Sequence, residues 1–208
     1  AIIVAIPICD QSLMEVVENW GDGVWSLLAF SMQMALVLVC GSALAAAPIV
    51  KKGISRLASA PKTPAGAIAF VSAISSVACW LNWGFGLIVG AILAKEVARK
   101  LRGVDYRLLI ASAYSGFVVW HSGISGSVPL SMATAGDALT KATNGIVSEP
   151  VPLSETIFSI YNFGIALGVI VALVIVNALM HPKGGNVICV DPSLLEESCT
   201  ECNKRAET

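Results

Sequence analysis

The chain contains four long segments without a charged side chain, and charged loops separate them. The uncharged segments cover residues 23–50, 63–94, 108–136 and 156–180. About 20 residues of helix cross the hydrocarbon core of a bilayer, so each segment is long enough to span one. The first and the last are continuous, which predicts membrane-spanning helices over residues 23–50 and 156–181.

The second segment is interrupted at its centre by the sequence LNWGFG, which combines Asn82 with two glycines. The loops on both sides of this segment, residues 51–62 and 95–107, are rich in Lys and Arg. Cytoplasmic loops carry an excess of these residues, and a single crossing would put the two loops on opposite sides. We therefore predict a re-entrant helical hairpin over residues 63–98, whose arms of about 15 residues, roughly 22 Å, reach past the membrane midplane.

The third segment contains the sequence HSGISGSVP, in which glycine, serine and proline accumulate. Pro129 lacks a backbone N–H and disfavours helix in the residue before it, so we attribute the interruption to this proline. Non-helical backbone at membrane depth is tolerated only where it is buried in protein or lines a watery cavity. Residues 107–136 are therefore predicted to form a broken membrane-spanning helix.

Composition places the chain in the membrane. It is 56% hydrophobic and 13% charged, with a mean hydropathy of +0.78, whereas soluble domains carry about 25% charged residues. We predict an all-α, multi-pass integral membrane protein of the cytoplasmic (inner) membrane, and the net charge of −1 argues against a nucleic-acid partner. Residues 1–9 are expected to be the end of a truncated helix and residues 183–208 a polar cytoplasmic segment, so we interpret the sequence as a fragment.

The polar groups at the two interruptions are the candidate binding site. Those of the first are Asn82, Trp83, Gly84 and Gly86, and those of the second are His121, Ser122, Gly123, Ser125, Gly126, Ser127 and Pro129. Unpaired N–H groups at a helix start attract an anion, while freed carbonyls and the amide oxygen can hold a cation. The alternative is structural: the asparagine caps the second arm, and the serines bond between helices.

No Asp or Glu lies inside any of the four segments, so only His121 could titrate there near neutral pH. Neutral oxygen ligands favour Na⁺ as a coupling ion, and the alternative is a coupling residue in a part of the protein outside this sequence. Cys199 and Cys202 have the spacing of half a zinc site, but no second pair or nearby histidine completes it, and we expect no metal.

Enzyme motifs are absent from the sequence. The stretch GISGS lacks the last glycine of G-x-S-x-G, and GFGLIVG has neither the spacing nor the context of a dinucleotide fingerprint. A membrane enzyme that uses His121 as a base has no evident nucleophile or metal-ligand set, so we do not expect an enzyme. A channel would also tolerate broken helices and remains an alternative.

Three stretches give the chain a resemblance to a known family. They are GDGVWSLLAFSMQMALVLVCGSALA, SVACWLNWGFGLIVGAILAKEVAR and VDYRLLIASAYSGFVVWHSGISGSVPL. Together with the tail sequence VDPSLLEE they resemble the short-chain fatty acid transporter family, which is grouped with the large ion-transporter superfamily. Ser122 stands where the family pattern leads us to expect glycine.

The resemblance implies a secondary active transporter that takes up acetoacetate, butyrate and similar monocarboxylates together with H⁺ or Na⁺. Another small carboxylate, such as a dicarboxylate, is the alternative substrate. Family proteins are about twice this long, and their two inverted repeats bring two hairpin tips and two unwound helices together at the membrane midplane. This chain would be one half of such an inverted-repeat transporter, with the second repeat, the lipid bilayer and a possible homodimer as partners. No cofactor is implied.

Overall fold

The computed structural model describes residues 12–134, 139–140, 143–147, 149–182, 186–191 and 195, and in these ranges its regular elements are all helical. The prediction of an all-α protein is therefore confirmed. Within the described residues, three stretches are long and apolar enough to cross a membrane: Pro64–Leu81, Tyr106–Ala133 and Ile160–Leu179. The predicted helix end at residues 1–9 lies outside the described residues. The chain divides into two compact units, Ala1–Ala43 and Leu44–Thr208.

Helix α2 covers Leu13–Ala46 and starts ten residues before the predicted segment at residue 23. The reason is a capping box: Ser12 N–H donates to Glu15 Oε2 at 2.7 Å, and Glu15 N–H donates to Ser12 Oγ at 3.3 Å. Residues 13–22, which precede the predicted segment, are therefore the first part of the helix. The predicted continuity to residue 50 is also wrong, because helix α3, Pro48–Leu57, begins after one intervening residue. Proline at a first helical position loses no hydrogen bond.

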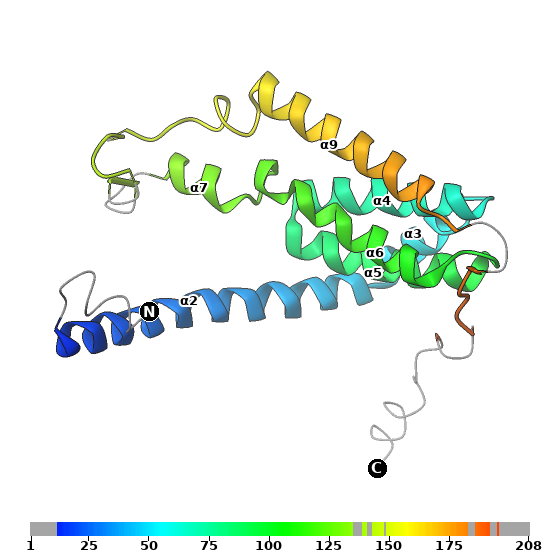
Figure 1. Ribbon diagram of the computed structural model, residues 1–208, viewed down its shortest axis with the longest axis horizontal. Helices are drawn as coiled ribbons and strands as arrows, with labels where there is room; N and C mark the ends of the chain where they lie inside the picture. The colour runs from blue at the N-terminus through cyan, green and yellow to red at the C-terminus, as the bar shows by residue number, and fades with distance from the viewer. Residues whose placement is uncertain are drawn as a thin grey trace, which may run out of the picture. The chain divides into compact units, whose positions relative to one another are not determined.

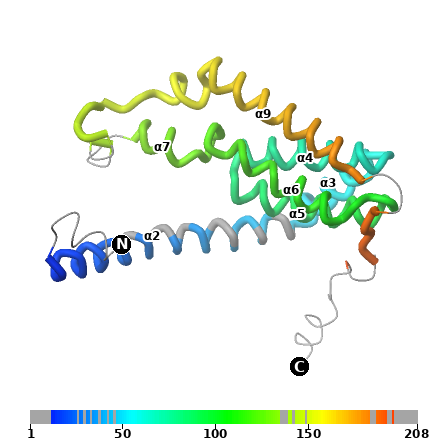
Figure 2. The backbone as a smooth tube through the Cα atoms, viewed as in Figure 1, coloured from blue at the N-terminus to red at the C-terminus, as the bar shows by residue number. Residues whose placement is uncertain are grey.

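Helices α4 (Pro64–Leu81) and α5 (Trp83–Lys100) form an antiparallel hairpin, and Asn82 between them has an extended backbone with φ −152° and ψ 117°. A Cβ on Gly86 would lie 2.4 Å from the backbone nitrogen of Cys79, and one on Gly90 would lie 2.7 Å from Ser75 Oγ. These two contacts pair residues at a four-residue step along both helices, so the backbones approach closely along one face. The chain thus turns back at LNWGFG, as Figure 2 shows.

The third apolar segment consists of three pieces. They are α6 (Tyr106–Ser115), the 3₁₀ helix η1 (Gly116–Ser122) and α7 (Ser127–Ala133), and a non-helical stretch from Gly123 to Gly126 separates the last two. The interruption therefore lies within the predicted sequence HSGISGSVP. Our explanation by Pro129 is wrong, however, because this residue lies in the first turn of α7, where its missing N–H costs no hydrogen bond.

Helix α9 covers Ile160–Leu179 and packs along α4 (Figure 1). It begins four residues after the predicted start at residue 156, because Ser159 Oγ accepts a hydrogen bond from Asn162 N–H at 3.2 Å and caps the helix there. Residues 153–158 form turns before it. The buried core of the second unit, Leu44–Thr208, lies among α3, α4, α5 and α6. It includes Ile54, Ile68, Val71, Leu93 and Leu109.

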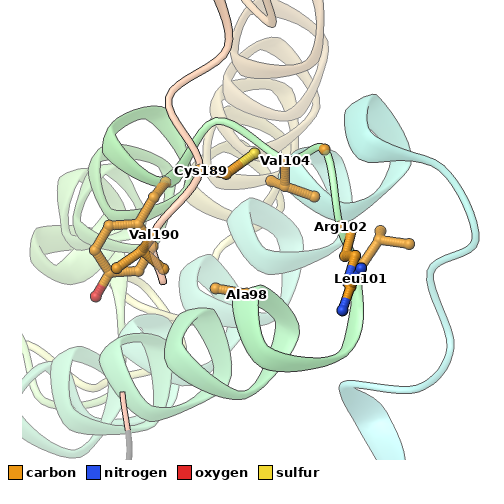
Figure 3. A pocket seen from close by; sticks show the side chains of 8 residues that line it. Ala98, Leu101, Arg102, Val104, Cys189 and Val190 are labelled. Carbon is orange, nitrogen blue, oxygen red and sulfur yellow. The ribbon is translucent and has the colours of Figure 1, made fainter. Parts of the chain in front are cut away.

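Residues 186–191 are tied to the loop between α5 and α6. Asp105 accepts from Ile188 N–H at 3.0 Å, and Tyr106 N–H donates to Ile188 O at 2.9 Å. Cys189 and Val190, which follow Ile188, line a pocket beside this loop (Figure 3). The segment after α9 is therefore held through both backbone groups of Ile188: its N–H donates to the Asp105 carboxylate, and its C=O accepts from Tyr106 N–H.

The carboxylate of Asp105 is the centre of this attachment, because it also caps α6 by accepting from Leu108 N–H at 3.0 Å. Burial raises its pKa, but the hydrogen bonds from Ile188 and Leu108 and the nearby Arg107 outweigh burial and hold the pKa at about 2. Since the folded-state pKa lies below the ordinary value of 3.8, the stability from this group is present above about pH 4 and is lost as the pH falls toward 2.

Candidate functional site

The hairpin tip and the broken helix, two features predicted separately, lie in direct contact. Trp83 N–H donates to Ser125 Oγ at 3.0 Å, and Ile124 N–H donates to the carbonyl of Trp80 at 2.9 Å. Gly123 packs so tightly on the tip that a Cβ there would lie 2.2 Å from Trp80 O. The non-helical backbone of the third segment is therefore satisfied in part by the tip of the hairpin, which explains how both can occur in an apolar region.

Asn82 caps α5, as the structural alternative proposed, because its Oδ1 accepts from Phe85 N–H at 3.0 Å. The side chain is nevertheless exposed, and its Nδ2 has no hydrogen-bond partner among the described residues. Trp83 N–H and Gly86 N–H are also occupied, the second by Asn82 O at 2.8 Å. Of the first N–H groups of α5, only that of Gly84 has no partner in the described ranges, so the tip offers fewer free N–H groups than predicted.

The other predicted residues divide into packing groups and groups open to a ligand. Gly126 is buried, and a Cβ on it would lie 2.6 Å from His121 O. Ser122 Oγ donates to Val119 O at 2.9 Å and is thus used within η1. His121 and Ser127 have exposed side chains, and Ser125, which accepts from Trp83, keeps its own hydroxyl proton without an acceptor among the described residues.

An aromatic cluster surrounds the tip. The Trp83 ring lies 5.9 Å from the Phe117 ring and 6.1 Å from the Trp120 ring, measured between centroids. Phe117 and Trp120 are stacked, with centroids 5.5 Å apart and ring planes 8° apart. Gly84 and Gly86, which follow Trp83 in the sequence, are buried. They have no side chain and contribute only backbone to the site. The site thus combines a few polar groups with an aromatic surface.

Asn162 is a site residue that the sequence analysis missed. Its Nδ2 donates to Ser122 O at 3.0 Å and to Ile157 O at 2.8 Å, so it satisfies a carbonyl at the end of η1. A second missed asparagine, Asn177, is buried and donates to Ser72 Oγ at 2.9 Å and to Ser115 Oγ at 2.8 Å. The available signal was two amides 15 residues apart in an apolar helix, a spacing that puts them near one face.

Asn177 belongs to a buried polar layer between α4, α6 and α9. Ser75 donates to the carbonyl of Ala113 in this layer, and the hydroxyl of Ser112 is fully buried without a partner among the described residues. Small hydroxyl side chains at these positions let the helices approach closely and cross-link. Within the described ranges, no group of three or more His, Cys, Asp or Glu side chains could hold a metal ion.

Comparison with known proteins covers the entire chain. The family model described as short chain fatty acid transporter matches residues 1–208. A relative from Escherichia coli (strain K12) named "Putative short-chain fatty acid transporter" is 45% identical over 195 residues, which are 94% of this chain and 43% of the relative. A relative of the same name from Haemophilus influenzae (strain ATCC 51907 / DSM 11121 / KW20 / Rd) is 44% identical over 196 residues, 93% of this chain and 44% of the relative. The chain thus spans less than half the length of these relatives, and no solved structure shows a significant match.

Proposed function

The chain belongs to the short-chain fatty acid transporter family, and we propose that it forms one half of a secondary active transporter for short-chain monocarboxylates. Its apolar helices and its family make it an integral membrane protein, and the family is one of transporters rather than enzymes. Uptake of acetoacetate, butyrate or a similar acid together with H⁺ or Na⁺ is the activity proposed for the complete protein.

The observation that carries the proposal is the contact between the hairpin tip and the broken helix. Trp83 N–H and Ser125 Oγ join two interrupted elements, and the exposed amide of Asn82 lies one residue away in the chain. Interrupted helices in transporters provide backbone and side-chain dipoles that replace the water around a charged substrate. A single contact between two such elements is thus a suitable place for a carboxylate.

We assign the carboxylate to the groups that the structure leaves without partners. These groups are three donors: the Asn82 Nδ2 amide, the Ser125 hydroxyl and the backbone N–H of Gly84, a buried residue. A co-transported cation would use neutral oxygens of the non-helical stretch, while a co-transported proton would use His121, whose side chain is exposed.

The proposal also assigns the chain a place in the membrane. With the tip near the midplane, α4 and α5 form a re-entrant hairpin. The basic segments at residues 51–62 and 95–107, which include the end of α3 and the end of α5, both face the cytoplasm of the inner membrane. A second, inverted repeat supplies the opposite half of the site, and movement of the two halves alternates access to it. The fold-back at Asn82 supports this arrangement, because it returns the chain to the side from which it came.

The experiment is uptake of labelled butyrate by the full-length protein in proteoliposomes, first with an inward Na⁺ gradient and then with a proton gradient alone. We expect saturable accumulation against the butyrate gradient. Uptake driven by Na⁺ supports oxygen ligands at the broken helix, and uptake driven only by protons supports His121 or a carboxylate in the second repeat. Absence of accumulation under both gradients, or uptake that never saturates, contradicts a secondary transporter.

A further inference from the structure

The 3₁₀ geometry of η1 builds a column of aromatic rings that leads to the candidate site. A 3₁₀ helix has three residues per turn, so side chains at i and i+3 lie directly above one another. Phe117 and Trp120 are such a pair, and their rings are stacked with 8° between the planes. Tyr114 continues the column on α6, with its ring centroid 6.1 Å from that of Phe117. In an α-helix, side chains at i and i+3 remain neighbours but are offset by about 60° around the axis, so the rings would be staggered and not directly superposed.

Trp83 connects this aromatic column to the polar groups of the hairpin tip. Its ring contacts both Phe117 and Trp120, while its backbone N–H donates to Ser125. All three rings are half-buried, so each keeps part of its surface open. Polar donors and an apolar surface thus meet at one residue, which is the arrangement that an amphipathic small molecule requires.

We propose that Trp83, Phe117 and Trp120 form the wall against which the hydrocarbon tail of the transported acid packs, and that Phe117 sets the chain-length preference. This inference rests on the proposed function, because it takes the carboxylate to lie at Asn82 and Ser125. Each methylene removed from water changes binding about fourfold, so a wall of this kind discriminates between acids that differ by two carbons.

The competing surface is an apolar groove of about 250 Å³ between α4 and α9. It is lined by Val77, Trp80, Phe163, Ala166, Leu167 and Ile170. The surface that this groove presents is apolar, because the one polar side-chain atom among its lining residues, Trp80 Nε1, is buried. The groove therefore offers no accessible donor to a carboxylate. The aromatic column is connected through Trp83 to the polar groups of the tip, and we assign the tail to the column.

The test compares Phe117→Ala with Phe163→Ala, which removes an aromatic ring of the competing groove instead. Phe163 contacts Trp80 at 6.4 Å between centroids, much as Phe117 contacts Trp83. Uptake of acetate and of butyrate by the full-length protein is measured in the same proteoliposome preparation, and the butyrate-to-acetate ratio is the readout, since it does not depend on how much protein inserts. We expect Phe117→Ala to lower the ratio about tenfold and Phe163→Ala to leave it unchanged.

Phe117→Leu, which keeps an apolar side chain, is expected to lower the ratio only two- to threefold. If Phe117→Ala does not insert, Trp120→Leu is measured by the same ratio and is expected to lower it. An unchanged ratio in the column variants overturns the inference but leaves the transporter proposal intact, and a shift confined to Phe163→Ala overturns it in favour of the groove. Failure of the unsubstituted protein to accumulate any acid removes the proposed function, and this inference with it.

Discussion

At the scale of single residues, Asn82 has a structural role and a proposed binding role. The oxygen of its side-chain amide serves the first role and the nitrogen serves the second. Oδ1 caps α5 through Phe85 N–H, while Nδ2 is free among the described residues. Thr63 provides a matched control, because its hydroxyl caps α4 through Gly66 N–H at 3.2 Å at the other end of the hairpin. The two caps share their chemistry, and only one lies at the site.

We expect Asn82→Ala to lower butyrate uptake tenfold or more, since a hydrogen bond to a charged group contributes about 1.5–3 kcal/mol. Thr63→Ala should cost about 1 kcal/mol of stability, as loss of a cap does, and preserve uptake. Asn82→Ser keeps a capping oxygen but lacks the amide nitrogen, so it should remain stable and lose uptake. Normal uptake by a well-inserted Asn82→Ser protein would show that this residue only caps the helix.

Residue types alone could predict where the chain breaks but not which groups stay free. Asparagine and glycine at the tip indicated the turn, yet the occupation of Trp83 N–H by Ser125 depends on a contact between positions 42 residues apart. The role given to Pro129 failed for a local reason, because proline is compatible with the first turn of a helix. The same residue type can therefore end one helix or begin the next.

At the scale of elements, α9 is held to the hairpin and to α6 by Asn177, whose amide joins Ser72 of α4 and Ser115 of α6. Asn177→Leu should reduce the free energy of unfolding in detergent by about 1–3 kcal/mol, because the hydroxyls of buried Ser72 and part-buried Ser115 lose their donor. Ile175→Leu, at an exposed position of the same helix, is the control and should be close to neutral. Thermal unfolding of the purified proteins measures both, and equal midpoints would contradict the role of Asn177.

The elements differ in how far the sequence predicted them. The hairpin and the interruption at Gly123–Gly126 follow from clusters of Asn, Gly and Ser, which are strong local signals. The start of α2 had an equally local signal in the capping pair Ser12 and Glu15. The prediction missed it because it placed the start of the helix at residue 23, where the uncharged run begins. The 3₁₀ form of η1 had no such local signal. This helix begins at Gly116, which packs so closely against α4 that a Cβ there would lie 2.6 Å from Ser76 N.

At the scale of the whole molecule, the sequence predicted that the protein lies in a membrane and that the chain folds back at the hairpin. The depth of the hairpin tip in the membrane depends on the surrounding bilayer, which is not part of the protein. Two arms of 18 residues each are about 27 Å long, close to the 30 Å hydrocarbon core. A tip in a cavity at the midplane and a tip on the far surface therefore differ in water access, not in the fold of the hairpin. Chemical accessibility in the native membrane distinguishes them.

Single cysteines in a cysteine-free protein provide this measurement. Ser59→Cys and Arg102→Cys mark the two basic loops, Ser154→Cys marks the turns before α9, and all three positions are exposed. With a membrane-impermeant thiol reagent, we expect the first two to react only from the cytoplasmic side and the third only from outside. Leu81→Cys, which is 50% exposed at the end of α4, should react slowly from either side if the hairpin is re-entrant and as fast as Ser154→Cys if it crosses the bilayer. Slowing of the Leu81→Cys reaction by butyrate, with the Ser154→Cys reaction unchanged, would show that substrate binding alters access to the hairpin tip.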